Sequence, residues 1–169
     1  MKNFIVVIGL ILLCTSCFVH KGQLVNGQCR PKHPNFKLLK IPFKETSKLA
    51  FNRVYTLNGQ YKIGVGFYND GRMILISNYN YKLQNYELIT NVFLEGKNWN
   101  ISETIGYWRV DGVQIKIEYF SCSNSGCYIR DNGKIKGDTL IFEKDCGTPN
   151  PFKSVKCPEK YVLSDLSFD

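Results

Sequence analysis

The pattern of apolar and polar positions divides the chain into three parts. Residues 4–13 form one apolar run without a charge. Residues 17–48 are basic and interrupted by prolines, which is typical of an extended linker rather than of a helix. Residues 49–169 alternate short stretches of aromatic and β-branched residues with turn residues, the pattern of successive strands. The sequence therefore predicts a signal peptide over 1–16, a basic tether over 17–48 and one β domain over 49–169.

The first strands of the β domain are predicted at residues 50–57, 61–68 and 73–78. The last two flank Asn69-Asp70-Gly71. An Asp-Gly pair between alternating apolar runs is a strong hairpin signal, because a type I′ turn needs a positive φ at both central positions. Residues 86–94 fit either a strand or a short helix.

A strand–turn–strand pattern recurs at residues 66–76, 106–117 and, more loosely, 129–142. In the second copy an apolar set of positions alternates with a polar set, which predicts one buried and one solvated face. The apolar set is Val113, Ile115, Ile117 and Tyr119, and the polar set is Gln114, Lys116 and Glu118. Successive hairpins must protect their edge strands, and closure into a barrel does so completely. We therefore expect an all-β antiparallel meander closed into a barrel, with a flattened β-sandwich as the alternative.

The apolar run near the N-terminus has the form of a secretory signal. It follows the single charge of Lys2 and ends at the small polar residues before Cys17. It is too short to span a bilayer, which takes about 20 residues. The segment Leu12-Leu13-Cys14-Thr15-Ser16-Cys17 resembles the bacterial lipobox, although Cys14 stands where leucine is usual. The resemblance implies cleavage before Cys17 and lipidation of its sulfur; an ordinary secretory signal cut at the same bond is the alternative.

The positive charge of the chain is concentrated beside this predicted anchor. The formal net charge is +8, and the stretch from Phe18 to Arg53 holds eight basic residues against Glu45 alone. A basic tether next to a lipid is attracted to anionic headgroups, so we expect it to face the membrane; a solvated linker without a target explains the charge equally well. The predicted membrane-facing residues are Lys21, Arg30, Lys32, Lys37, Lys40 and Lys44. The remaining chain is neutral and shows no basic stripe, so no nucleic-acid partner is expected.

The seven cysteines predict disulfides, because an exported chain meets an oxidising environment. Cys122 and Cys127 flank a short loop, and Cys146 and Cys157 flank a proline-rich loop. We expect these two pairs to form bridges. Cys14 leaves with the signal, and lipidation of Cys17 would leave Cys29 as an odd thiol. A free Cys17 would instead allow three bridges.

The domain beyond Arg53 contains no histidine, the commonest general base, and no known nucleophile or phosphate-binding motif. The carboxylates Glu103, Asp111 and Glu118 fit a solvated sheet face. Closely spaced cysteine pairs with a nearby histidine, as zinc prefers, are missing from this domain. The sequence therefore predicts no enzymatic activity, no metal site and no cofactor.

Two motifs resemble the small lipocalin-like lipoproteins of Gram-negative envelopes, particularly those of the Bacteroidetes. They are Gly106-x-Trp108 and Gly133-x-Ile135-x-Gly137-Asp138-Thr139-Leu140. In a true lipocalin the first motif lies on the first strand, whereas here it lies in the middle of the domain. The resemblance implies an extracytoplasmic protein anchored in the cell envelope, at the outer membrane rather than the inner one, with no assigned reaction.

The sequence thus predicts a lipid-anchored, non-enzymatic binding or interaction module that accepts at most a small apolar ligand. The alternative is a freely secreted, disulfide-bonded β protein whose basic arm binds an acidic partner, such as a polyanionic glycan. Neither the ligand nor the oligomeric state follows from the sequence.

Overall fold

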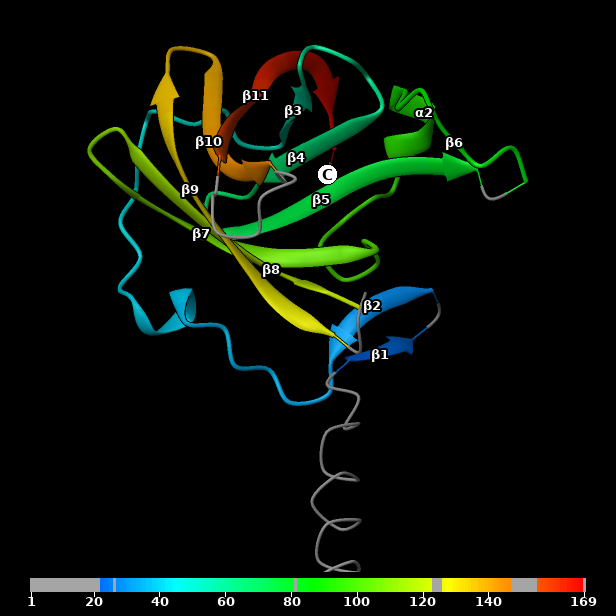
Figure 1. The fold of residues 1–169 in the computed structure, drawn as a ribbon, viewed down its shortest axis with the longest axis horizontal. Coiled ribbons are helices and arrows are strands. Elements are labelled where there is room, and N and C mark those ends of the chain that lie inside the picture. Colours follow the sequence, from blue (N-terminus) through cyan, green and yellow to red (C-terminus); the bar gives the residue numbers. More distant parts are fainter. Residues whose placement is uncertain (1–21, 26, 81, 123–125, 147–154, 169) are drawn as a thin grey trace, which may run out of the picture.

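The computed structural model describes residues 22–25, 27–80, 82–122, 126–146 and 155–168. Eight of its strands form a closed antiparallel barrel with lipocalin-like geometry (Figure 1). Each strand pairs with the next one along the chain, and β11 returns to pair with β3. The predicted all-β meander barrel is confirmed, and the flattened sandwich does not form. The barrel strands are β3 (Arg53–Leu57), β4 (Ile63–Phe67), β5 (Arg72–Asn80), β7 (Thr104–Asp111), β8 (Gln114–Ser121), β9 (Cys127–Lys136), β10 (Thr139–Cys146) and β11 (Val155–Ser167).

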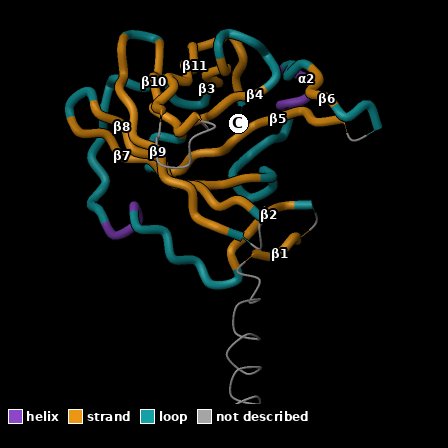
Figure 2. The backbone as a smooth tube through the Cα atoms, viewed as in Figure 1, coloured by secondary structure: helices purple, strands orange, loops and turns teal. Residues whose placement is uncertain are grey.

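Shorter elements surround the barrel. Strands β1 (Gly22–Val25) and β2 (Gln28–Pro31) form a hairpin, and β6 (Asn85–Glu87) extends β5. The stretch that the sequence left open between strand and helix contains both, because β6 is followed by the short helix α2 (Asn91–Leu94). The short 3-10 helix η2 (Leu38–Lys40) is coloured purple in Figure 2.

Among the described residues, no helix combines the length and the apolar character needed to cross a bilayer.

The base of the barrel, the end with the turns at 68–71 and 111–113, is filled by aromatic side chains. Trp108 is fully buried, and its ring contacts Phe43, Phe51 and Phe67. Its indole N–H donates to the Tyr68 carbonyl oxygen at 3.0 Å, so its one polar group is satisfied. An eight-stranded barrel has an interior just wide enough for side chains to fill, and the base is packed in this way.

Gly106, the glycine of the Gly-x-Trp motif, allows β7 and β8 to approach closely. A Cβ at this position would lie 2.3 Å from the carbonyl oxygen of Glu118 and 2.9 Å from the Cα of Tyr119. Backbone atoms cannot move aside as the end of a flexible side chain can. The motif therefore has a packing role in the middle of this domain.

Two smaller apolar clusters lie on the outer surface of the barrel. One brings the C-terminal residues Leu166 and Phe168 together with Ile89 and Leu94 against β3, β5 and β7. The other places Phe36 over Phe120, with Tyr107 and Tyr128 at its border. The barrel wall is thus covered by chain segments that are distant in sequence.

The predicted linker lies against the barrel over much of its described length. We call residues 33–43 the N-terminal strap; in Figure 1 it runs from the β1–β2 hairpin along the outside of the barrel. The exposed fractions of Phe36 and Leu38 are only 3% and 5%. Backbone groups of the strap are also held, because Asn35 N–H donates to the Tyr128 hydroxyl at 2.7 Å and Arg109 Nε donates to the Ile41 carbonyl at 2.9 Å. The extended-linker interpretation therefore does not describe this segment.

A disulfide fixes the N-terminal hairpin to the barrel, but the predicted pairing is wrong. Cys122 is bonded to Cys29, 93 residues away, and Cys127 is an exposed free thiol. Cys29 N–H also donates to the Glu103 carbonyl at 2.8 Å, which brings β2 beside β7. The local-loop argument failed because Cys29 lies in a hairpin that packs on the barrel. Cys157 is disulfide-bonded, as expected; the side chain of its predicted partner Cys146 lies outside the described part.

Candidate functional site

A group of polar side chains points into the barrel at its mouth, the end opposite the base. Residues directly opposite one another in an antiparallel pair share a face of the sheet. Asp131 is opposite Ile117, Glu159 is opposite Phe142, and both apolar partners belong to the interior core. We name this group the interior polar cluster. Its members are Tyr119, Asp131, Lys144, Glu159 and Tyr161.

Lys144 is the centre of the interior polar cluster. Its Nζ lies 3.1 Å from Glu159 Oε2 and 3.6 Å from Asp131 Oδ2. It also forms a side-chain hydrogen bond with Tyr119. One ammonium group on β10 is therefore shared between two carboxylates and a phenol that come from three other strands.

Burial changes the titration of the cluster. It raises the pKa of Asp131 above its ordinary value, and it raises the pKa of Tyr161 to about 12 and that of Tyr119 as well. Burial also acts to lower the pKa of Lys144, but the neighbouring Tyr119, Asp131 and Tyr161 more than offset it, so the net direction is upward. Lys144 is therefore an ammonium at neutral pH.

The cluster is partly exposed to solvent. The side chains of Lys144 and Glu159 are 32% and 33% exposed although both face inward, whereas that of Asp131 is 12% exposed. Tyr119 and Tyr161 lie deeper and are buried. The free thiol of Cys127 is on the same face, two positions before Ile129 and four before Asp131 on β9, so it lies at the rim. The mouth is polar and accessible, in contrast to the packed base.

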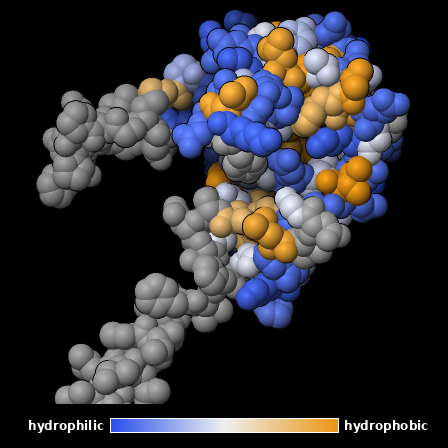
Figure 3. Space-filling view, turned by 90° about the vertical axis from the view of Figure 1, so that its right-hand side faces the viewer, coloured by the Kyte–Doolittle hydropathy of each residue, from blue (hydrophilic) through white to orange (hydrophobic). Residues whose placement is uncertain are grey.

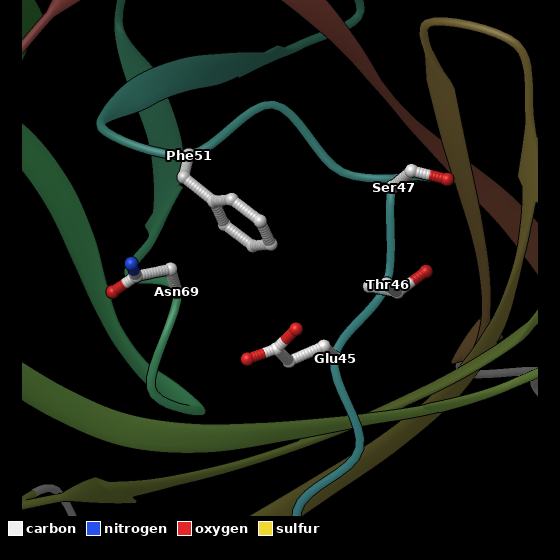
Figure 4. Close-up of a pocket in the computed structure, with 5 residues that line it drawn as sticks. All are labelled: Glu45, Thr46, Ser47, Phe51 and Asn69. Atoms are coloured by element: carbon white, nitrogen blue, oxygen red, sulfur yellow. The ribbon is translucent and has the colours of Figure 1, made fainter.

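A shallow pocket of about 440 Å³ lies near the base, outside the interior polar cluster. Figure 4 shows the ring of Phe51 and the carboxylate of Glu45 pointing into it, and the hydroxyl of Ser47 pointing away. Glu45, Ser47 and Asn69 are all exposed. Because no polar group in it is buried, this pocket lacks the converging partners of a specific binding site.

Glu118 corrects the expectation that its face of β8 is solvated. Its side chain is fully buried on the outside of the barrel, beneath the N-terminal strap. Oε1 accepts from Arg130 Nε at 2.7 Å, and Oε2 accepts from the backbone N–H of Leu38 at 2.8 Å. Glu118 therefore holds η2 in place. The other two predicted surface carboxylates, Glu103 and Asp111, are exposed.

The predicted basic tether divides into structural and exposed residues. Arg30 is structural: its guanidinium donates to the carbonyl oxygens of Cys29, Asn100 and Ser102, and burial lowers its pKa. Lys32, Lys37, Lys40 and Lys44 are exposed. Lys21 lies outside the described residues, as does the predicted lipidation site Cys17.

Exposed apolar side chains gather in two groups, apart from single residues elsewhere such as Leu24. Leu39 and Ile41, at 51% and 43% exposure, lie among the lysines of the strap. The face in Figure 3 shows separate apolar patches in a mostly hydrophilic surface. The second group of exposed apolar side chains lies around β6 and α2. Its members are Tyr79, Leu83, Tyr86, Leu88 and Val92.

Within the described ranges, no group of three or more histidine, cysteine, aspartate or glutamate side chains is arranged to hold a metal ion.

Sequence reasoning missed the interior polar cluster. Asp131, Lys144 and Glu159 were assigned no role from the sequence. The sequence of β10 does indicate an inward-facing lysine, because Leu140, Phe142 and Lys144 are alternate residues and lie on the same face of the strand. Two apolar residues followed by a lysine on the same face place that lysine inside the barrel.

Comparison of the chain with protein-family models, with curated proteins and with solved structures finds no match. The fold and the geometry of the mouth are therefore the basis for the functional argument.

Proposed function

We propose that this protein is a non-enzymatic binding module that holds a small ligand at the mouth of its barrel. The observation behind the proposal is the interior polar cluster, a set of inward-facing titratable side chains that solvent reaches. Barrels of eight strands either fill their interior with side chains or hold one small ligand. In this chain the base is filled, and the mouth is the part that remains for a ligand.

The ligand that fits this geometry is less apolar than the sequence alone predicts. Trp108 and Phe67, both fully buried, occupy the apolar end of the interior. The accessible end presents Lys144 and Glu159 instead. A ligand with a polar head group and a short apolar part would place the head group at the cluster and the apolar part against Phe142 and Ile129, which belong to the interior core.

Binding at the mouth can be tested by two-dimensional NMR of the full chain, titrated with short amphiphiles such as hexylamine, hexanoate and hexanol. We expect at least one of them to shift amide signals of β9, β10 and β11 in a saturable manner. Shifts confined to the outer surface, or no saturable shift with any of the three, would contradict the proposal.

We also propose that the module is held at a membrane of the cell envelope, through a lipid on Cys17. The lipobox-like segment supports this proposal. Intact-mass measurement on membrane and soluble fractions of cells expressing the full precursor tests it, with Cys17→Ser as the control. An acylated membrane form that the substitution abolishes is the expected result. A soluble, unacylated mature chain would favour the secreted alternative, with the exposed lysines binding a polyanionic glycan.

The N-terminal strap offers a second contact with such a membrane. Along the chain, the exposed Leu39 and Ile41 lie between the exposed Lys37 and Lys40 of the strap and Lys44 directly after it. Cations beside apolar side chains are favourable at an anionic bilayer surface, with roughly 1 kcal/mol per cation.

Vesicle binding separates the two kinds of basic residue. Lys37→Gln with Lys40→Gln is expected to weaken binding to vesicles containing phosphatidylglycerol about tenfold or more, relative to the unaltered chain. Arg30→Lys keeps the charge and is expected to leave vesicle binding unchanged while it destabilises the fold, since lysine cannot reproduce the forked hydrogen bonds of arginine. Equal binding by the double variant and the unaltered chain would rule out a role for the strap.

A further inference from the structure

We propose that the interior polar cluster selects ligands whose head group is a hydrogen-bond-donating organic cation, such as a primary amine. This inference rests on the proposed function, because it concerns the ligand of the same site. It is argued from the charges of the cluster, its hydrogen bonds and its access to solvent.

The charges of the cluster do not cancel. Asp131 and Glu159 contribute two negative charges, and Lys144 contributes one positive charge. One negative charge is therefore left inside the barrel wall, where solvent screens it less than it would at the surface. A monovalent cation in the mouth would neutralise this charge, and a carboxylate ligand would double it.

The hydrogen bonds of the cluster lead to the same ligand chemistry. An ammonium has three donors and no acceptor, while an ionised carboxylate only accepts. Lys144 already contacts Tyr119, Asp131 and Glu159. Asp131 Oδ2 and Glu159 Oε2 are buried, and Lys144 Nζ is the ion-pair partner of both, at 3.6 Å and 3.1 Å. Each ionised carboxylate can accept several hydrogen bonds, and the three donors of one shared ammonium do not fill all of these acceptor sites.

The titration of Asp131 is consistent with this view. Burial raises its pKa in spite of the lowering effect of Lys144. The single lysine thus compensates only part of the cost of placing Asp131 inside the barrel. A second cation nearby would supply the remaining compensation, and the pKa of Asp131 would fall when the ligand binds.

An organic cation fits better than a divalent metal ion. The cluster offers two carboxylates, and the described part of the chain places no third histidine, cysteine or carboxylate with them. A divalent ion with oxygen ligands generally takes six or more. A primary amine needs only a few acceptors, which two carboxylates and the phenol oxygens of Tyr119 and Tyr161 supply.

The test compares hexylamine, hexanol and hexanoate, which share an apolar chain and differ in head group. Binding to the full chain is measured by NMR titration at neutral pH. We expect hexylamine to bind at least tenfold more tightly than hexanol, the difference expected for one charge-assisted hydrogen bond, and hexanoate to bind most weakly.

Variants of the cluster sharpen the comparison. Asp131→Asn and Glu159→Gln are each expected to weaken hexylamine binding about tenfold and to leave hexanol binding unchanged. Glu143→Gln is the matched control, because Glu143 precedes Lys144 on β10 but is exposed on the outer face. It should leave the affinities for all three probes unchanged.

The possible outcomes are distinct. Equal affinity for the three probes, or tighter binding of hexanoate, would overturn the inference and leave the proposed function standing. Absence of saturable binding by every probe would overturn both. The preference among probes is measured on the unaltered chain, so the inference stays testable even if a variant fails to fold.

Discussion

At the scale of single residues, Glu118 connects the N-terminal strap to the barrel. It accepts one hydrogen bond from Arg130 and one from the Leu38 backbone, and it is fully buried. Glu118→Ala removes both charge-assisted hydrogen bonds, so we expect the free energy of unfolding to fall by about 2–4 kcal/mol. Urea denaturation measures this change. Glu143→Ala, at an exposed position, should stay within about 0.5 kcal/mol of the unaltered protein. Equal effects of the two substitutions would show that Glu118 does not secure the strap.

Tyr161 predicts a loss of stability at alkaline pH. Its pKa is raised from 10.0 to about 12 by burial, so between these values the unfolded chain loses the phenolic proton while the folded chain retains it. Unfolding is then favoured as the pH rises, and this residue contributes a decline of about 2–3 kcal/mol across the window. Tyr161→Phe should flatten the decline in denaturation experiments at pH 9.5 and 12. Tyr86→Phe, at an exposed position, is the control; an unchanged slope in Tyr161→Phe would contradict the assignment.

At the scale of elements, the β1–β2 hairpin and the strap depend on the Cys29–Cys122 bond. The bond closes a loop of 93 residues. Its removal by Cys29→Ala with Cys122→Ala should lower the free energy of unfolding by about 2–4 kcal/mol. Hydrogen exchange should show β1 and β2 losing protection before the barrel strands. Cys127→Ala removes a free thiol and should change neither quantity. Uniform loss of protection across the barrel would instead mean that the hairpin is part of the global folding unit.

The elements also show what the sequence could and could not predict. The hairpins at Asp70-Gly71 and Asp111-Gly112 were predictable because turn chemistry and strand alternation are local properties. The packing of the N-terminal strap over Glu118 was not predictable, because Leu38, which donates to Glu118, is 80 positions away along the chain. The Cys29–Cys122 bond was missed for the same reason. At the mouth, the inward direction of Lys144 follows from its place on the same face of β10 as Leu140 and Phe142, but its pairing with Asp131 and Glu159 depends on strands that are distant in sequence.

At the scale of the whole molecule, the end of β11 completes the outer cover of the barrel. Phe168 N–H donates to the Asn52 carbonyl at 3.1 Å, and its ring lies edge-on to Tyr68 over Gly66. Phe168→Ala would open a cavity in this outer cluster, so we expect a loss of about 3–5 kcal/mol in the free energy of unfolding. Thermal and urea denaturation measure it. Val92→Ala, at 80% exposure, is the matched control and should be nearly neutral. A small effect of Phe168→Ala would show that the barrel closes without this cover.

The disulfide between Cys29 and Cys122 also has a consequence for the lipid anchor proposed at Cys17. A free linker over residues 17–48 would let the barrel move roughly 100 Å from its anchor at full extension. Because β1 begins at Gly22 and the hairpin is fixed to the barrel, the chain length between a lipidated Cys17 and β1 would be five residues, which span about 17 Å at most. Cys122 directly follows β8, close in sequence to Tyr119, so the hairpin is fixed at the mouth end. If Cys17 carries the proposed lipid, the barrel would stay at the bilayer surface with its opening close to the lipid, where amphiphilic molecules are most concentrated.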